Sequence, residues 1–181
     1  MGKLKINYIK LMNKHPKRPE LEKGNGAQFI RDKALPYLKG IGLDVGCSRW
    51  KIKPDVIGVD IRKIPGVDLT IHDWNAISSN EYDYLFSSHC LEHIENWQDA
   101  LEHWVRVVKI DGIVFLYLPN PVSYNRWSKV FAKQHKHDFT LARIINELKK
   151  LGIEIIDNGY DEYAGMYVVG EKSNKFLKCF L

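Results

Sequence analysis

Short apolar runs separated by helical segments constrain the fold of this chain more than any other feature of its sequence. From Ile41 onward, runs of five to seven mostly apolar residues recur along the chain. Near-continuous apolar runs of this length are typical of strands buried on both faces, as in parallel sheets. They occupy residues 41–45, 56–60, 67–71, 82–87 and 112–118.

Two segments between the strand candidates have the periodicity of amphipathic helices. After Asn96, apolar residues follow at the i, i+3, i+4, i+7 spacing as far as Val108. The same spacing follows Thr140 as far as Leu151, and Gly152 stands where a glycine would end the helix. Strands that alternate with helices predict an α/β fold with crossover helices.

The last two apolar runs, residues 153–157 and 166–171, are joined by eight residues rich in turn formers. Because this connection is too short for a crossover helix, we expect the two strands to pair antiparallel. We therefore predict a doubly wound, mostly parallel, seven-stranded Rossmann-like sheet that ends in a C-terminal antiparallel hairpin.

The first 40 residues differ from the rest in charge. They hold ten lysines and arginines against three acids, a net charge of +7, whereas residues 41–181 carry −2. We interpret residues 1–40 as an N-terminal helical lid segment over a domain at 41–181. The lid would attract a phosphate, an acidic glycan, RNA or an anionic membrane, or it could simply be a solvated surface.

Composition excludes several classes of protein. Three cysteines, far apart in the sequence, form neither a disulfide framework nor a zinc knuckle, which favours a reducing compartment. We find no signal peptide and no apolar run of the ~20 residues that a membrane span needs. We therefore expect a cytoplasmic protein without a transmembrane segment; the sequence leaves its oligomeric state open.

Polar residues gather where the predicted strands end, which is where doubly wound sheets bind ligands. Gly46 follows the first strand, and Asp60 ends the second. Asp73 and Trp74 follow the third strand, and the fourth runs into the sequence Ser-Ser-His-Cys-Leu-Glu-His at 87–93. This set predicts a nucleoside site with an acceptor for ribose hydroxyls. A dinucleotide fits less well, because only one glycine of the Gly-x-Gly-x-x-Gly fingerprint is present.

The order of these motifs resembles the class I S-adenosylmethionine-dependent methyltransferases, most closely the methyltransferase-11-like group. The resemblance covers about residues 41–171. It departs from the family at Ser48, where a second glycine is usual. Only eleven residues separate Ser48 from Asp60, so the first crossover helix should be missing or reduced to a turn. The motifs, in order, are LDVGCS, VIGVDI, IHDWN, YDYLFSSHCLEHIENW, GIVFLYLPNP, HKHDFT and LKKLGIEI.

The resemblance implies S-adenosyl-L-methionine as cofactor and assigns contacts by position. Asp44 and Gly46 would line its methionine end, and Cys47 and Ser48 would offer backbone donors. Asp60 would accept hydrogen bonds from the ribose hydroxyls.

The remaining cofactor contacts concern the adenine and the methyl group. Ile61 would lie against the adenine, Trp74 would flank it, and Asp73 would accept from its amino group unless it only caps a turn or helix. Ser88, with His89 beside it, would face the sulfonium.

The candidate catalytic residues are histidines. If the acceptor is a hydroxyl, a base within hydrogen-bond reach assists, and the candidates in order are His89, His93 and His137. The pair Glu92 and His93 suggests a metal site or a catalytic dyad, but the resemblance places it at the start of the helix after the fourth strand, which favours capping and packing. Residues 135–138 (His-Lys-His-Asp) are interpreted as a substrate-facing rim, and no metal site is predicted.

These expectations favour an enzyme that methylates a small-molecule or glycan acceptor, with a hydroxyl as the target. A nucleic-acid methyltransferase that uses the basic N-terminal segment is a less favoured alternative. A non-catalytic cofactor-binding module is the third.

Overall fold

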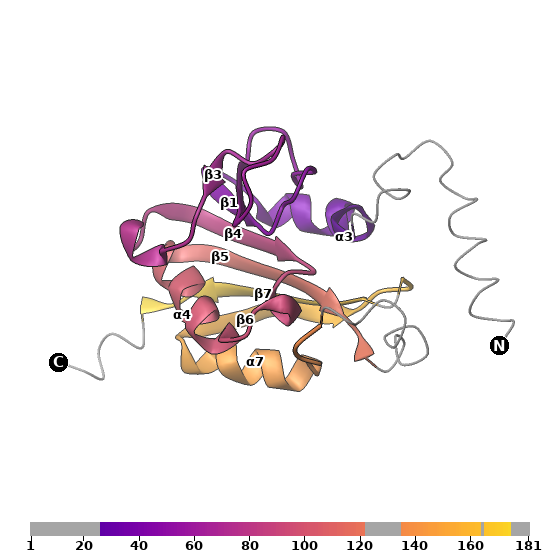
Figure 1. Cartoon of the computed structure of the whole chain (residues 1–181). Helices are drawn as coiled ribbons and strands as arrows, with labels where there is room; N and C mark the ends of the chain where they lie inside the picture. The colour runs from indigo at the N-terminus through magenta and orange to yellow at the C-terminus, as the bar shows by residue number, and fades with distance from the viewer. Residues whose placement is uncertain (1–25, 122–134, 164, 175–181) are drawn as a thin grey trace, which may run out of the picture.

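Seven strands form one sheet in the order β3-β2-β1-β4-β5-β7-β6 (Figure 1). The structure is a computed structural model that describes residues 26–121, 135–163 and 165–174. Pairing is parallel from β3 through β5, and antiparallel between β5 and β7 and between β7 and β6. The predicted fold class and the C-terminal hairpin are confirmed. The strands are β1 (Gly42–Val45), β2 (Ile57–Asp60), β3 (Leu69–Thr70), β4 (Tyr82–Ser88), β5 (Val108–Pro119), β6 (Ile153–Tyr160) and β7 (Gly165–Lys172).

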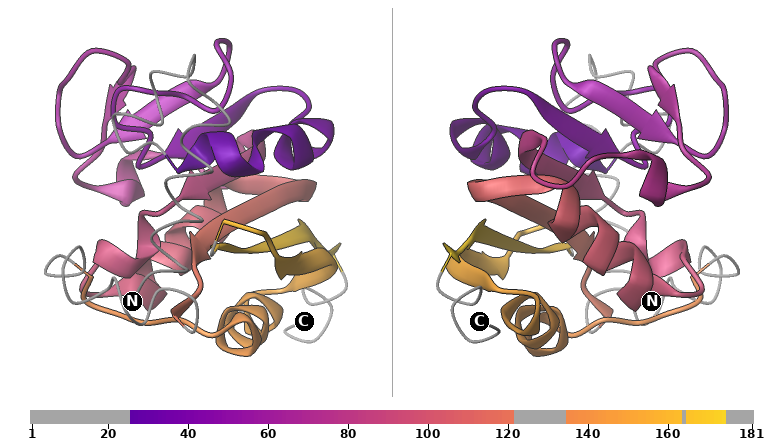
Figure 2. Two further views of the ribbon diagram at one scale, coloured as in Figure 1. Left: turned by 90° about the vertical axis from the view of Figure 1, so that its right-hand side faces the viewer. Right: turned by 90° about the vertical axis from the view of Figure 1, so that its left-hand side faces the viewer.

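Helices cover both faces of the sheet (Figure 2). Helices α4 (Trp97–Val107) and α7 (Leu141–Lys150) pack on one face, and α3 (Ala27–Ala34) packs on the other. Successive strand residues alternate between the two cores: Leu85 packs with α4, whereas Phe86 packs with α3. Because both faces of these strands are buried, successive strand residues are apolar and form continuous runs in the sequence. The short 3-10 helices are η1 (Leu35–Tyr37), η2 (Trp74–Ala76) and η3 (Leu91–His93).

Part of the expected N-terminal segment belongs to the core of the domain. Ala27, Ile30, Ala34 and Leu38 are buried against the sheet. Residues 26–40 are therefore a layer of the fold. Residues 1–25, the remainder of the predicted lid segment, lie outside the described residues.

The connection from β1 to β2 contains no helix, as the spacing of Ser48 and Asp60 predicts. Its turns bury Ile52 and Val56 in the core beneath α3. The Arg31 side chain of α3 donates from Nε to the carbonyl of Ile52 at 2.9 Å. Helix α3 thus holds the β1–β2 loop in place by this hydrogen bond, at the position where the related pattern has a crossover helix.

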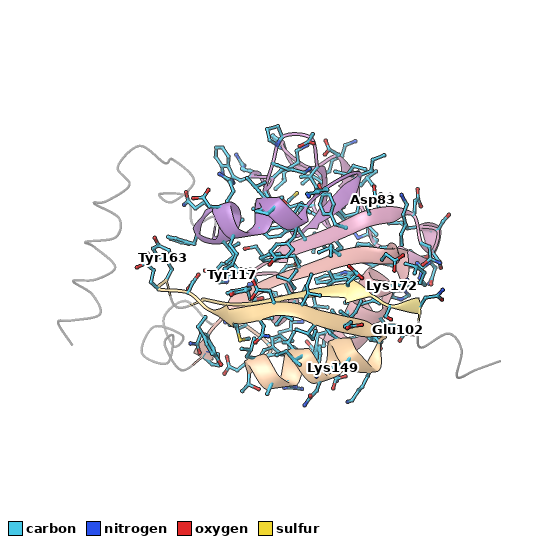
Figure 3. The ribbon with its side chains drawn as sticks, turned by 180° about the vertical axis from the view of Figure 1, so that it is seen from behind. Asp83, Glu102, Tyr117, Lys149, Tyr163 and Lys172 are labelled. Carbon is cyan, nitrogen blue, oxygen red and sulfur yellow. The ribbon has the colours of Figure 1, made fainter. Side chains whose placement is uncertain are left out.

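The C-terminal hairpin is fastened at both of its ends (Figure 3). At its tip, Tyr163 stacks on Phe29 of the α3 layer with ring centroids 4.6 Å apart. At its base, the Lys172 ammonium donates to the carbonyls of Val105 and Val108 at 2.9 and 2.8 Å. Lys172 therefore joins β7 to the end of α4, where helix carbonyls need donors.

In the part of the chain that the structure describes, no helix combines the length and apolar character needed to cross a membrane.

Candidate active site

A cavity of about 890 Å³ opens at the carboxyl ends of β1, β2 and β4. This volume is within the usual range for a site that holds a small ligand or cofactor. The predicted residues that line it are Gly46, Cys47, Ser48, Asp60, Ile61, Trp74, Ser88, His89 and His93.

The turn after β1 depends on two residues with left-handed backbone. Gly46 has φ +77°, and a Cβ there would lie 2.5 Å from the Cys90 sulfur. Ser48, where the related pattern has glycine, also has positive φ, +51°. Its amide donates to the Asp60 carboxylate at 3.2 Å. The backbone conformation of the glycine-rich turn is thus kept without the second glycine, at a cost of about 1–2 kcal/mol for a non-glycine residue.

Asp60 presents its carboxylate at the end of β2. The backbone amide and Nε of Arg62 donate to Oδ1 at 3.0 and 3.2 Å. Burial alone would raise the pKa of Asp60, but the hydrogen bonds from Arg62 and from the Ser48 amide outweigh burial and hold the pKa below its ordinary value. The group is therefore an ionised acceptor at neutral pH. The Arg62 side chain is 62% exposed, so it can turn toward water if ligand hydroxyls take its place.

Asp44 is not among the residues that line the cavity, and its expected contact with the methionine end stays a prediction. It is buried in β1, and its carboxylate accepts from the Ile52 amide at 2.6 Å, which braces the loop that replaces the helix. Burial raises the pKa of Asp44 to about 7, while the Ile52 hydrogen bond opposes this shift.

The raised pKa of Asp44 predicts a pH-dependent stability. Between the ordinary pKa of 3.8 and the folded value of about 7, the folded protein holds a proton that the unfolded chain has released. The free energy of unfolding should therefore fall as pH rises through this window. Asp44→Asn carries no such proton, so urea unfolding should show the variant gaining stability relative to wild type from about pH 4 to about pH 7. A stability difference that is constant over this range would contradict the assignment.

Asp73 is also outside the cavity lining, and its contact with adenine stays a prediction. It is exposed and caps η2, with Oδ1 accepting from the Asn75 amide at 2.9 Å. The neighbouring Trp74 does line the cavity and lies against Trp104, with ring centroids 6.4 Å apart. The structure thus favours the alternative of a helix cap for Asp73.

The cysteines in this region do not supply a thiolate. Burial raises the pKa of Cys47 to about 12 and that of Cys90 to about 12. Since a thiol reacts as its thiolate, neither group is a nucleophile near neutral pH.

Three histidines surround the buried carboxylate of Glu92, which the sequence interpretation treated as capping and packing. Oε1 of Glu92 lies 3.4 Å from Nδ1 of His89, 3.8 Å from Nε2 of His93 and 4.0 Å from Nε2 of His135. Burial lowers the pKa of His135 below its ordinary value, although Glu92 opposes this, so the imidazole is neutral near pH 7. The sequence placed His135 with His137 and Asp138, whereas the fold places it beside Glu92.

His137 is not part of this group. Its Nε2 lies 2.9 Å from the carbonyl of Glu95, and its ring packs near Trp97 and Phe139. It is absent from the cavity lining, where His89 and His93 are found, so its catalytic role stays an untested prediction.

Several solved structures with the same fold are described as methyltransferases. An S-adenosylmethionine-dependent methyltransferase from Archaeoglobus fulgidus has 18% identity and a TM-score of 0.64, over 91% of this chain and 99% of that one. A Thermotoga maritima protein described as a possible histamine N-methyltransferase has 15% identity and a TM-score of 0.66, over 92% and 99%. At these identities the likeness concerns the fold.

The sequence itself adds a family match. Residues 43–116 match the family model of a methyltransferase domain. This part of the chain is thus similar to a methyltransferase domain, and the fold that it shares with S-adenosylmethionine-dependent methyltransferases agrees with the match. No curated protein matches this methyltransferase in sequence. The matched residues run from β1 to β5 and so include the turn after β1, the end of β2 and Glu92.

The cavity of the methyltransferase fits its cofactor, S-adenosyl-L-methionine. Gly46, in a left-handed turn at the end of β1, has no side chain of its own and lies beside the Cys90 side chain in the cavity lining. Asp60 offers an ionised acceptor for hydroxyls. The Ser88 hydroxyl is buried and has no hydrogen-bond partner among the described residues. A ligand that brings hydroxyl, amino and carboxylate groups would satisfy this set.

Proposed function

We propose that this methyltransferase transfers the methyl group of S-adenosyl-L-methionine to a hydroxyl of a small molecule or glycan held in the cavity. The observation that carries the proposal is the position of His89 and His93, which line the cavity beside Ser88. Imidazole nitrogens are the side-chain groups best suited to accept a hydroxyl proton near neutral pH.

We further propose how the chain holds the cofactor. Asp60 would accept from the ribose hydroxyls, Ile61 and Trp74 would border the adenine, and the turn at Gly46 and Ser48 would face the methionine end. Support comes from their common position on one cavity wall and from the charge of Asp60.

In the proposed reaction the protein positions the acceptor hydroxyl against the methyl group and removes the hydroxyl proton. The cofactor supplies a methyl group on a positively charged sulfur. His89 would take the hydroxyl proton as the acceptor oxygen approaches the methyl carbon in line with the sulfur. Positioning supplies most of the rate effect, and a general base adds roughly 10²- to 10⁴-fold.

A similar structure supports a small acceptor. The Burkholderia thailandensis 1,6-didemethyltoxoflavin-N1-methyltransferase, solved with 1,6-didemethyltoxoflavin and S-adenosylhomocysteine bound, has 12% identity and a TM-score of 0.66, over 93% of this chain and 88% of that one. That enzyme methylates nitrogen, whereas the histidines at this cavity favour a hydroxyl.

Replacing His89 tests the proposed base. Its backbone has φ +48°, a conformation that asparagine tolerates, so His89→Asn removes the base with the least strain. We expect turnover of a hydroxyl acceptor to fall by roughly 10²- to 10⁴-fold, with unchanged affinity for S-adenosylhomocysteine. The measurement is release of S-adenosylhomocysteine from a panel of hydroxyl-bearing metabolites and oligosaccharides, with RNA and DNA oligonucleotides alongside.

The matched control is His72→Asn, which changes an exposed histidine outside the cavity lining. Wild-type turnover by His89→Asn would show that His89 is not the general base. Methylation of the oligonucleotides alone would replace the small-molecule proposal with the nucleic-acid alternative.

A further inference from the structure

The carboxylate of Glu92 is in an unusual electrostatic position. The side chain is 0% exposed, and within the described part of the chain neither of its oxygens has a hydrogen-bond partner. Burying a charged carboxylate without hydrogen bonds costs several kcal/mol unless a cation compensates for it. The fold therefore leaves Glu92 in need of a positive partner.

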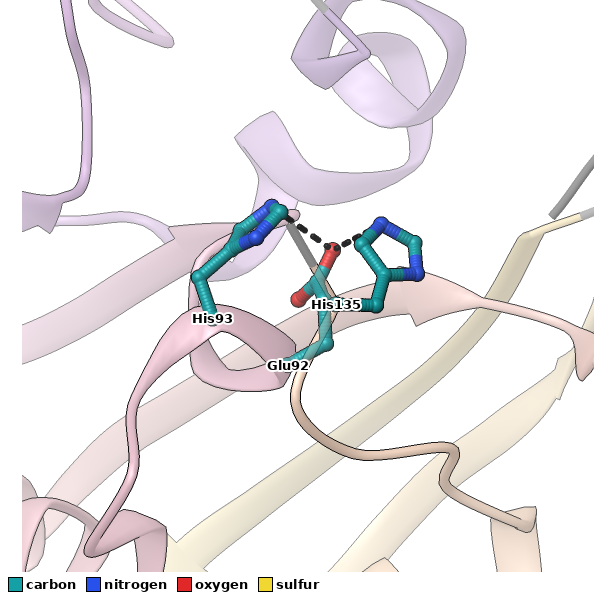
Figure 4. A group of neighbouring side chains, drawn as sticks. All are labelled: Glu92, His93 and His135. Carbon is teal, nitrogen blue, oxygen red and sulfur yellow. Dashed lines mark ion pairs between the residues drawn. The ribbon is translucent and has the colours of Figure 1, made fainter. Parts of the chain in front are cut away.

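The groups that face this carboxylate are ring nitrogens (Figure 4). Ligand atoms of Glu92, His93 and His135 all lie within 4.8 Å of one another. Around a tetrahedral cation with ligand distances near 2.1 Å, ligand atoms would be about 3.4 Å apart. Oε1 of Glu92 is 3.8 and 4.0 Å from the two Nε2 atoms, so a closure of about half an ångström would bring the carboxylate to tetrahedral ligand spacing from both imidazoles.

An ion pair with one protonated histidine is the alternative explanation. It would bring one ring nitrogen to hydrogen-bond distance, about 2.8 Å. Instead, Oε1 stands 3.4 to 4.0 Å from His89, His93 and His135 together. Three imidazole nitrogens thus share one buried carboxylate oxygen at longer than hydrogen-bond distance, an arrangement that a metal cation bound among them would explain.

Backbone hydrogen bonds fix the two segments that carry these groups. The amides of Lys136 and His137 both donate to the carbonyl of Glu92, at 2.8 and 3.2 Å. His135 is thereby held against η3, which carries Glu92 and His93. The ligand set depends on the fold and not on a mobile surface side chain.

We propose that Glu92, His93 and His135 bind one divalent transition-metal cation at the wall of the cavity. Two imidazoles and a carboxylate are the ligand set of many catalytic zinc sites, which keep a further position open. Imidazole ligands favour such ions over Mg²⁺ and Ca²⁺, which take oxygen ligands.

The site would act on the acceptor, and this role rests on the proposed function. Of the three proposed ligands, His93 lines the cavity, so a cation bound to it would lie at the edge of the space that holds the acceptor. An acceptor hydroxyl there would become more acidic. The bond between the methyl carbon and the acceptor oxygen forms as the C–S bond breaks. The electron pair of the C–S bond stays on sulfur, and the hydroxyl proton passes to His89.

Zn²⁺ titration of the chelator-treated full chain tests the site, with Mg²⁺ in parallel. By calorimetry we expect one Zn²⁺ per chain, much weaker Mg²⁺ binding, and a Tm that rises with Zn²⁺. Glu92→Gln and His135→Ala should each weaken Zn²⁺ binding about 100-fold or more, because even outer partners of metal ligands contribute 10- to 100-fold. His72→Ala, which removes an exposed histidine, should bind Zn²⁺ like wild type.

S-adenosylhomocysteine affinity, measured on the same samples, separates the two proposals. Variants that bind it normally are folded, and a wild type that binds it without saturable Zn²⁺ binding overturns the metal site alone. Equal Zn²⁺ affinity in wild type, Glu92→Gln and His135→Ala would also overturn it. Zn²⁺ binding by a wild type that does not bind S-adenosylhomocysteine would instead overturn the proposed function.

Discussion

Asp60→Ala should weaken the binding of S-adenosylhomocysteine by roughly 10- to 150-fold. Asp60 is the ionised carboxylate on the cavity wall at the end of β2, and each charge-assisted hydrogen bond lost there should cost about 1.5–3 kcal/mol. Isothermal titration calorimetry measures the change directly. Arg62 and the Ser48 amide also lose their partner in this variant, so circular dichroism must show that the fold is retained.

Asp55→Ala is the matched control for this experiment. Asp55 is an exposed acid that pairs with Lys53 at 3.4 Å and does not line the cavity. We expect wild-type affinity from the control. Wild-type affinity in a folded Asp60→Ala protein would show that the ribose is held elsewhere.

Trp97→Ala should lower the free energy of unfolding by about 3–5 kcal/mol, the usual range for removal of a large buried aromatic side chain. Trp97 begins α4, is 2% exposed, and meets Phe139 edge to face with centroids 4.9 Å apart. The Arg143 guanidinium of α7 lies over its ring at 4.9 Å. Trp97 thus joins α4, the segment after His135 and α7.

Urea unfolding of Trp97→Ala and Trp97→Phe measures this contribution. The phenylalanine variant keeps a ring against Phe139 and should lose less stability. A loss below about 1 kcal/mol in Trp97→Ala, the size of an average substitution, would contradict the packing role. Since Phe139 follows the segment of His135, the alanine variant should also bind Zn²⁺ more weakly than the phenylalanine variant if the proposed metal site exists.

The elements of the fold follow from local patterns in the sequence. Runs of apolar residues predicted the strands because a strand between two helical layers is buried on both faces. The 3.6-residue periodicity predicted α4 and α7, and the side chain of Thr140 does accept from the Arg143 amide at the start of α7. The short connection before β7 predicted the antiparallel hairpin because a crossover helix cannot fit there.

The local sequence pattern does not predict which way the carboxylates at the strand ends point. Asp44 and Asp60 both belong to strands that lead into the crevice, and the sequence assigned both to the cofactor. The structure turns Asp44 toward the Ile52 amide and leaves only Asp60 on the cavity wall. Which way such a side chain turns depends on the path of the following loop, and that path has no periodic pattern.

The histidine group depended entirely on tertiary structure. Adjacent residues Glu92 and His93 were visible in the sequence, but His135 comes from a segment beyond β5. Its neighbours in sequence, His137 and Asp138, suggested a different grouping. The amides of Lys136 and His137 bind the carbonyl of Glu92, and this contact between distant segments selects which histidine faces the buried carboxylate. The sequence alone thus determined the strands, the helices α4 and α7, and the edge of the sheet at which the cavity opens. Only folding decided the partners of Glu92, because non-local backbone contacts set them.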